Sequence, residues 1–250
     1  MKDLSTEAAT TAEARRDLAA AFRWAAREDL HEGVANHFSL ALDPAGRRFL
    51  MNPDQVHFER VTASRLIELD AGDPATMDRP GAPDPTAWGL HGAIHRACPH
   101  ARCVLHLHPP YATALAALAD SRLPAVDQNG AMFHGRVAVD EGYAGLAFEE
   151  EGARMAAHLA DPAIKVLVMG NHGVLAVGAT VAEAWTWLYH FERACRTYVL
   201  ALSTGRPLRV LPDGVAETVA RQTDAYPGFG TRLLEEMRAV LDQEGSDYAQ

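Results

Sequence analysis

The sequence predicts an α/β domain in which helices cover a mixed, mostly antiparallel sheet. Alanine-rich stretches with helical periodicity alternate with short apolar runs that are typical of strands. These segments lack the regular strand–helix period of a Rossmann or barrel fold, and neither G-x-G-x-x-G nor a P-loop motif occurs. Two apolar runs, at 166–169 and 174–177, lie so close together that they predict a hairpin.

The amino-terminal segment predicts a long amphipathic helix. Within the alanine-rich stretch 6–28, Leu18, Phe22 and Ala25 fall on one stripe, as expected for a helix that buries one face. The helix should end near Gly33. Because the segment is charged and helical in pattern, we expect no secretory signal.

The remaining elements follow from apolar runs, turn residues and helix-start signals. The segment 70–85 is rich in Asp, Gly and Pro, which predicts a loop leading into a helix from Thr86 to about Ala97. This helix would carry His91 and His95 on one face, since they are four residues apart. Strands are expected over 36–42 and 48–51 and from residue 103, and further helices over 110–119, 149–160, 181–203, 214–225 and 230–242.

Length and composition fit one domain spanning residues 1–250. The chain has 250 residues and 48% hydrophobic content, enough to bury a full core. No run of about 18 apolar residues occurs, so we expect a soluble, cytoplasmic protein without a transmembrane helix. Cys98, Cys103 and Cys195 are an odd number without metal-ligand spacing, and we expect them to be reduced, mostly buried thiols.

The charge balance argues against nucleic acid or an anionic membrane as a partner. The formal net charge is -10, and basic pairs occur only at Arg15-Arg16 and Arg47-Arg48. A small-molecule substrate is the better expectation. The sequence contains twelve histidines, and six of them gather in one region: His91, His95, His100, His106, His108 and His134.

Two of these histidines are spaced for a strand. His106 and His108 are two residues apart in an apolar segment, so alternation sends both rings to one face of the sheet. His172 lies in the turn between the two runs that predict the hairpin. Three neutral imidazoles can hold a divalent cation and leave coordination positions open for a substrate. The alternative is that the pair consists of polar residues on a half-solvated strand.

Several segments together resemble the class II aldolase/adducin family, and they occur in family order between about residues 12 and 203. The matching segments are Asn36–Ser39, Leu90–Arg96, Cys103–Pro110, Gly170–Gly173 and Ala182–Cys195. The resemblance implies a three-layer α/β/α domain with a central sheet, followed here by carboxy-terminal helices over 212–243. It also implies a metal held by His106, His108 and His172, and commonly a homotetramer with active sites at subunit interfaces.

The departures from the sugar-phosphate aldolases of this family concern the substrate. Those enzymes carry a Ser-Ser-Glu run that binds phosphate and supplies an acid/base carboxylate; here the run reads Pro85-Thr86-Ala87. Their phosphate-binding Gly-Asn pair appears here as Asn36-His37. A tyrosine acid of the aldolases falls near Gln128. We therefore expect an unphosphorylated substrate, with Asn36, Thr86 and Gln128 as candidate substrate-binding residues.

Loss of the carboxylate at Ala87 favours decarboxylation over retro-aldol cleavage. Cleavage of a hydroxy-carbonyl compound needs a base for the hydroxyl proton, whereas decarboxylation needs an electron sink and a later proton donor. We therefore predict a metal-dependent carbon–carbon lyase, specifically a decarboxylase of a small hydroxy or oxo carboxylic acid, possible substrates including hydroxyaromatic acids, with a metal-stabilised enolate. Candidate catalytic residues are His91, His37 and Tyr143. For His91 a core hydrogen-bonding role is the alternative. For His95 on the helix and His100 in the following loop, a solvated position is expected.

Three other functions are compatible with the same residues. An aldolase would act on an unphosphorylated or phosphorylated hydroxy-carbonyl substrate. A non-heme iron oxygenase would use the three histidines to hold Fe²⁺ instead of Zn²⁺ or Mn²⁺. An adducin-like interaction module would need no metal at all.

Overall fold

The computed structural model describes residues 4–78, 81–143, 145 and 149–250. Its described strands form one seven-stranded sheet in the order β3-β2-β1-β4-β7-β6-β5. Every neighbouring pair is antiparallel except β5 and β6, which are parallel. The sheet is therefore mixed and mostly antiparallel, as predicted. The strands are β1 (His37–Ala41), β2 (Arg48–Met51), β3 (Ile67–Asp70), β4 (Cys103–Leu107), β5 (Val137–Asp140), β6 (Val166–Met169) and β7 (Gly173–Gly178).

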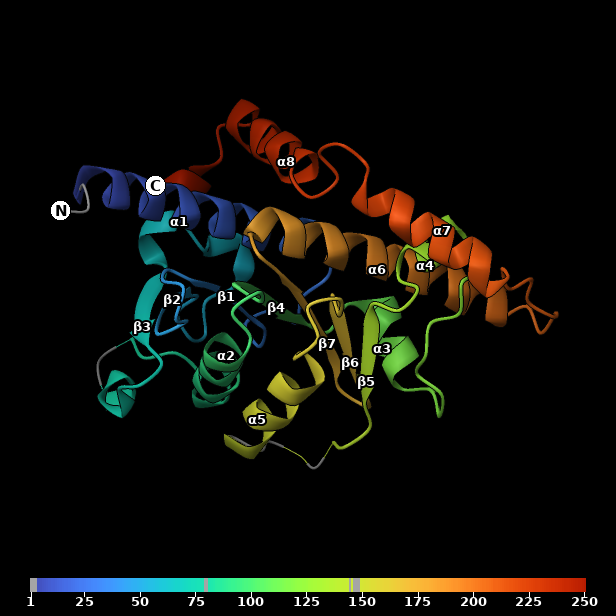
Figure 1. Cartoon of the computed structure of the whole chain (residues 1–250). Coiled ribbons are helices and arrows are strands. Elements are labelled where there is room, and N and C mark those ends of the chain that lie inside the picture. The colour runs from blue at the N-terminus through green and yellow to red at the C-terminus, as the bar shows by residue number, and fades with distance from the viewer. Residues whose placement is uncertain (1–3, 79–80, 144, 146–148) are drawn as a thin grey trace.

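Helices cover both faces of this sheet, which gives the three layers of an α/β/α arrangement (Figure 1). The long helices α1 and α6 lie together over one face with α8 outside them, while α2 and α5 lie on the other face. The helices are α1 (Leu4–Arg27), α2 (Pro85–Ala97), α3 (Pro110–Ala116), α4 (Gln128–Met132), α5 (Glu149–His158), α6 (Val181–Leu202), α7 (Asp213–Asp224) and α8 (Arg232–Gln243).

Strand alternation divides the core between the two faces. In β4, Leu105 packs with the cluster that contains α1 and α6, whereas Val104 packs with the cluster of α2 and α5. In β1, Phe38 and Leu40 belong to the α1 and α6 side. Because neighbouring residues of a strand point to opposite faces, His37 and Ser39 in β1 and His106 in β4 face α2.

The register brings three site segments to one end of the sheet. His37 in β1 is paired with His106 in β4, and Leu107 in β4 is paired with Val174 in β7. The end of β4 therefore lies beside the turn between β6 and β7. In that turn Asn171 has a φ of 58°, a left-handed conformation that asparagine adopts more readily than most residues.

The predicted helices and the hairpin are present, but several short elements were missed, among them β3, β5 and α4. The strands β3 and β5 lie at the two edges of the sheet and are mostly half-buried, and α4 has only five residues, so none of them shows a clear apolar pattern. The helix expected over 110–119 ends at Ala116, where the hydroxyl of Ser121 donates to the Ala116 carbonyl. Part of the expected loop 70–85 forms a helical turn, Pro74–Asp78.

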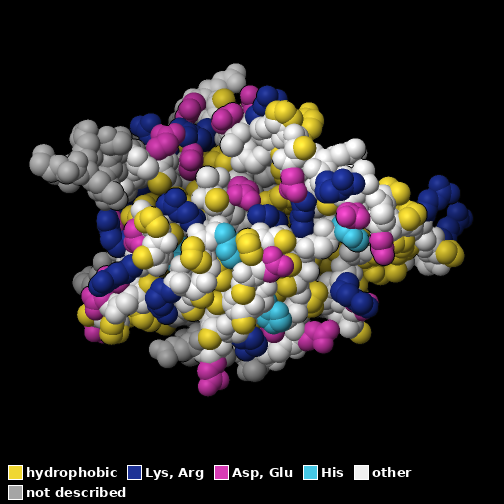
Figure 2. Space-filling view, in the orientation of Figure 1, with side chains coloured by type: hydrophobic (Ala, Val, Ile, Leu, Met, Phe, Trp, Pro, Cys, Tyr) yellow, Lys and Arg dark blue, Asp and Glu magenta, His cyan; other side chains and the backbone are white. Residues whose placement is uncertain are grey.

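The distribution of charged side chains on the surface and the burial of the three cysteines agree with what the amino-acid composition predicts. Acidic and basic side chains are interspersed over the face shown in Figure 2. Within the described part of the chain, no helix is both long and apolar enough to cross a membrane. The three cysteines are free and buried, as predicted.

Candidate metal centre and its pocket

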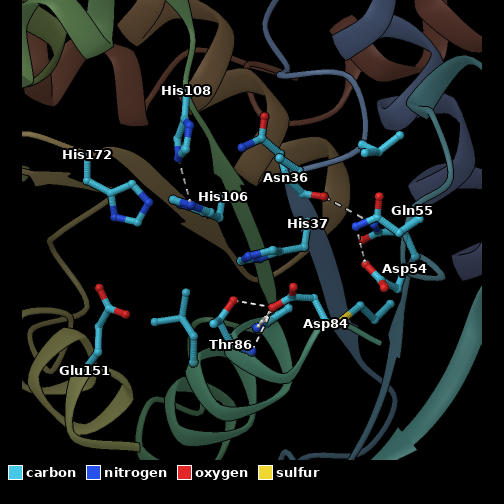
Figure 3. Close-up of a pocket in the computed structure, with 16 residues that line it drawn as sticks. Asn36, His37, Asp54, Gln55, Asp84, Thr86, His106, His108, Glu151 and His172 are labelled. Carbon is cyan, nitrogen blue, oxygen red and sulfur yellow. Dashed lines mark hydrogen bonds between the residues drawn. The ribbon is translucent and has the colours of Figure 1, made fainter. Parts of the chain in front are cut away.

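The structure brings His106, His108 and His172 together. One ring nitrogen of each lies within 4.8 Å of the corresponding nitrogens of the other two. His106 is the last residue but one of β4, His108 follows the end of that strand, and His172 lies in the turn before β7. The strand alternation and the hairpin expected from the sequence therefore place the three rings around a common point, as Figure 3 shows.

Gly173 permits this close approach. A Cβ atom at Gly173 would lie 2.4 Å from Cδ2 of His108 and 2.5 Å from the carbonyl oxygen of Leu107. Real side chains essentially never come so near to such atoms, so any other residue would push β7 away from the end of β4. The glycine thus sets the distance between the two segments that carry the histidines.

The hydrogen bonds of two rings fix which nitrogen faces the centre. Nδ1 of His106 donates to the carbonyl of Val174 at 3.1 Å, and Nδ1 of His108 donates to a carboxylate oxygen of Glu32 at 2.7 Å. Both partners can only accept, so in the neutral rings both Nε2 atoms carry lone pairs. These two Nε2 atoms lie 3.2 Å apart. Two lone pairs at this distance repel unless a cation or a proton lies between them.

Burial favours the neutral form that binds a cation. It lowers the pKa of His106 well below its usual range and that of His172 to about 4. Nδ1 of His172 is buried and makes no hydrogen bond among the described residues. The donor set, the facing nitrogens and this unpartnered atom together fit a divalent metal held by three imidazoles.

A cavity of about 280 Å³ opens beside the three histidines (Figure 3). Its lining includes three carboxylates and, among the described residues, neither lysine nor arginine. The described residues that line it are Val34, Ala35, Asn36, His37, Met51, Asn52, Asp54, Gln55, Asp84, Thr86, Ala87, Leu90, His106, His108, Glu151 and His172.

Asn36 and Thr86, two of the predicted substrate-binding residues, line this cavity. The side-chain oxygen of Asn36 accepts from the backbone N–H of Glu32 at 2.7 Å, which fixes the orientation of the amide. Its Nδ2 is buried without a partner, so it is free to donate to a bound molecule. Thr86 lies in the first turn of α2, where its hydroxyl and backbone N–H both donate to the capping carboxylate of Asp84.

Gln128, the third candidate, lies elsewhere. It belongs to α4 and lines a separate depression together with residues of α7, among them Val219 and Thr223. The loose alignment with the tyrosine of the aldolases therefore does not bring Gln128 to the histidines.

The three predicted catalytic residues have different positions. His37 lines the cavity, with its Nδ1 2.7 Å from Nε2 of His91. His91 is fully buried behind His37 and is not among the residues that line the cavity. Tyr143 is about half exposed, and its ring centre lies 5.6 Å from that of His172. His95 was expected on a solvated face; this was wrong, since it is buried and hydrogen-bonded to Ser39.

Four carboxylates of the site were missed by the sequence analysis: Glu32, Asp54, Asp84 and Glu151. Glu32 bonds His108, and Glu151 at the start of α5 is buried and lines the cavity, where burial raises its pKa. In sequence Glu151 is the last of three consecutive glutamates, a pattern typical of a solvated helix start. The signal in the sequence is the small residue that follows, Gly152. In the structure, a Cβ atom at this position would lie 2.8 Å from the carbonyl oxygen of Gly89 in α2. The small residue lets α5 approach α2 and directs Glu151 inward.

The fold and the three-histidine site define a class of α/β/α domain with a candidate metal centre at one end of its sheet. Comparison with known families assigns it: the model of the class II aldolase and adducin N-terminal domain matches residues 16–199. The chain therefore belongs to the class II aldolase/adducin family.

Individual relatives agree with this assignment. A protein of Caulobacter vibrioides, whose name places it among class 2 aldolase proteins, is 33% identical over 240 residues, covering 95% of this chain and 92% of the relative. The decarboxylase NovR of Streptomyces niveus is 29% identical over 196 residues, covering 78% and 71%. The crystal structure of an aldolase II superfamily protein from Pseudomonas syringae has a TM-score of 0.84 and 32% identity, with 96% of each chain covered.

Proposed function

We propose that this protein is a divalent-metal-dependent carbon–carbon lyase, specifically a decarboxylase of a small, unphosphorylated hydroxy or oxo carboxylic acid. The observation that carries the proposal is the lining of the cavity. Three imidazoles converge at one end, three carboxylates lie around it, and no lysine or arginine occurs among the described lining residues. A dianionic phosphate group would find no basic side chain to bind among the described lining residues, whereas the charge of a single carboxylate can be balanced by the cation itself. The relationship to the decarboxylase NovR supports the reaction type.

The residues of the chain divide the remaining work. The cation, bound by His106, His108 and His172, would act as a Lewis acid toward the substrate. Asn36 Nδ2, buried without a partner, donates to a substrate oxygen. When the bond to the carboxylate breaks, CO₂ leaves and the electron pair stays on the substrate. Glu151 then delivers a proton to that carbon, and its raised pKa keeps the carboxyl able to hold this proton before transfer.

An aldolase acting on an unphosphorylated hydroxy-carbonyl compound is the second candidate, and Glu151 is the observation that favours it. Ala87 stands where the sugar-phosphate aldolases carry their glutamate, yet α5 brings another carboxylate into the same cavity. This carboxylate could remove the hydroxyl proton that retro-aldol cleavage requires. The products distinguish the two reactions, because one releases CO₂ and the other releases an aldehyde or ketone.

The experiment is a product screen over hydroxyaromatic and oxo acids with protein loaded with Zn²⁺ or Mn²⁺. We expect CO₂ release that stops when the metal is removed. In His106→Ala, metal and activity should be lost together in a folded chain, while His134→Ala, which changes an exposed histidine, should keep both. Oxygen uptake by an Fe²⁺-loaded protein would instead support an oxygenase, and full activity of metal-free His106→Ala would overturn the mechanism.

The proposal extends to the native metal and to the oligomeric state of the protein. Zn²⁺ or Mn²⁺ suits a lyase, and Fe²⁺ is the ion that an oxygenase would need. We propose a homo-oligomer, specifically a tetramer, in the cytoplasm.

An adducin-like module without catalysis would retain its interactions after the metal is removed, which a chelator experiment would reveal.

A further inference from the structure

A chain of buried hydrogen bonds runs from the cavity into the core beneath α2. His37 Nδ1 lies 2.7 Å from His91 Nε2, and His91 Nδ1 lies 2.5 Å from the hydroxyl of Ser39. The same hydroxyl lies 2.7 Å from His95 Nε2, and His95 Nδ1 lies 3.1 Å from the carbonyl oxygen of Ala101. All four side chains are buried, and only His37 lines the cavity.

The far end of this chain fixes the direction of every bond in it. The carbonyl of Ala101 can only accept, so Nδ1 of His95 carries the proton and Nε2 of neutral His95 accepts. Ser39 has one hydroxyl proton and gives it to His95, so its oxygen accepts from Nδ1 of His91. Neutral His91 then accepts at Nε2 from Nδ1 of His37.

The reverse direction would need an extra charge in the core. If Nε2 of His37 carried the proton, each bond would turn around, and His95 would have to donate from both nitrogens as an imidazolium. Burial opposes that state, since it lowers the pKa of His95 to about 4 and that of His91 well below its usual range. The neutral chain therefore has one arrangement, in which Nε2 of His37 is an acceptor.

We propose that His91, Ser39 and His95 are positioning residues that hold His37 as a fixed hydrogen-bond acceptor beside the metal, so that the cavity selects a ligand with a hydroxyl group at that point. His37 lies next to the metal triad, with its ring centre 4.8 Å from that of His106, and Figure 3 shows the ring between His106 and Thr86. Asn36 supplies a donor nearby. The pattern of one acceptor and one donor beside a cation matches a hydroxy carboxylate, which deepens, and rests on, the proposed function.

The first test measures the ring tautomers directly. In ¹⁵N-labelled protein, metal-free and zinc-loaded, long-range ¹H–¹⁵N spectra should show His37 protonated at Nδ1 and unprotonated at Nε2. In Ser39→Ala, His91 loses the hydrogen bond that fixes its tautomer. Both His91 and His37 should then show a mixture of the two neutral tautomers. Ser121→Ala, which removes another buried hydroxyl outside the site, should leave both rings unchanged. A protonated Nε2 in wild-type His37, or unchanged rings in Ser39→Ala, would overturn the proposal.

The second test measures selectivity with a matched pair of ligands. Zinc-loaded protein should bind glycolate at least about 10-fold more tightly than methoxyacetate, because the ether oxygen of methoxyacetate cannot donate and leaves a buried acceptor unpaired. In Ser39→Ala this ratio should fall to within about 3-fold at unchanged zinc content, while Ser121→Ala keeps it. An equal ratio in wild type and Ser39→Ala, or no binding of either acid, would refute the selectivity. Neither test needs turnover, so failure of the lyase reaction would be seen separately.

Discussion

Nε2 of His106 and Nε2 of His108 lie 3.2 Å apart, although the other nitrogen of each ring donates to a group that can only accept. Two neutral rings held in this way point lone pairs at each other. The arrangement is stable when a positive charge lies between them, and the nearby ring of His172 provides a third nitrogen. The folded chain thus places three ring nitrogens where a bound cation would relieve this repulsion.

Glu32 should tune metal affinity without stabilising the fold. We expect Glu32→Gln to weaken zinc binding by about 10- to 100-fold, because the carboxylate orients His108 and raises the basicity of its Nε2. Glu28→Gln removes the same charge from an exposed position four residues earlier and should bind zinc like the wild type. Zinc titration against a competing chelator measures both. Equal losses in the two variants would mean that net charge, and not orientation, sets the affinity.

Gly173→Ala should damage the metal site through geometry alone. The new methyl group meets His108 and the Leu107 carbonyl, so β7 or the His108 ring must move. We expect about 1–3 kcal/mol lower unfolding free energy and a clear loss of zinc affinity. Gly214→Ala, where a Cβ meets nothing within 4 Å, is the control. Denaturant unfolding and zinc titration would check the result, and wild-type zinc affinity in Gly173→Ala would contradict it.

Glu151 should act in proton transfer and not in metal binding. Once a substrate is found, Glu151→Gln should lower kcat by about 10²- to 10⁴-fold while leaving the zinc content unchanged, because an amide cannot supply the proton. Glu150→Gln, on the exposed side of the same turn, should have wild-type kcat. A Glu151→Gln variant with normal kcat would assign the proton to another group, and Tyr143, whose ring lies near that of His172, would be tested next.

Glu192 should make stability depend on pH. Its carboxylate accepts from the backbone N–H groups of Tyr111 and Ala112 at the start of α3, and burial raises its pKa to about 7 from 4.5. Because the pKa of Glu192 is higher in the folded chain than in the unfolded chain, folding favours the protonated carboxyl. The resulting contribution to the unfolding free energy is complete below pH 4.5 and is lost as the pH rises through about 7.

The comparison of wild type with Glu192→Gln isolates this contribution. Between pH 4.5 and pH 8 the unfolding free energy of the wild type should fall by about 2–3 kcal/mol relative to the variant, since one pKa unit corresponds to about 1.4 kcal/mol. Urea unfolding at several pH values measures the difference. Parallel pH profiles for the two proteins would show that Glu192 keeps the same pKa on unfolding.

Local patterns predicted much of the fold and the shared face of two of the three clustered histidines. The long helices have apolar periods, and the hairpin of β6 and β7 has two continuous apolar runs, both of which the sequence displays directly. The same logic applied to His106 and His108, because a spacing of two on a strand determines a shared face whatever the surroundings. The strands β3 and β5 escaped prediction because they are edge strands whose residues are mostly half-buried, whereas β2 and β6, which also have four residues each, are mostly buried apolar runs.

The sequence by itself determined that His106 and His108 share a face, that a turn carries His172, and that Ala87 lacks the carboxylate of the aldolases. Only the tertiary structure decided which other groups enter the pocket. Glu151 depends on how closely α5 packs on α2, and the direction of the chain from His37 to His95 depends on contacts among β1, α2 and the Ala101 carbonyl. Local spacing sets the face on which a side chain lies, whereas packing between distant segments sets what it meets there.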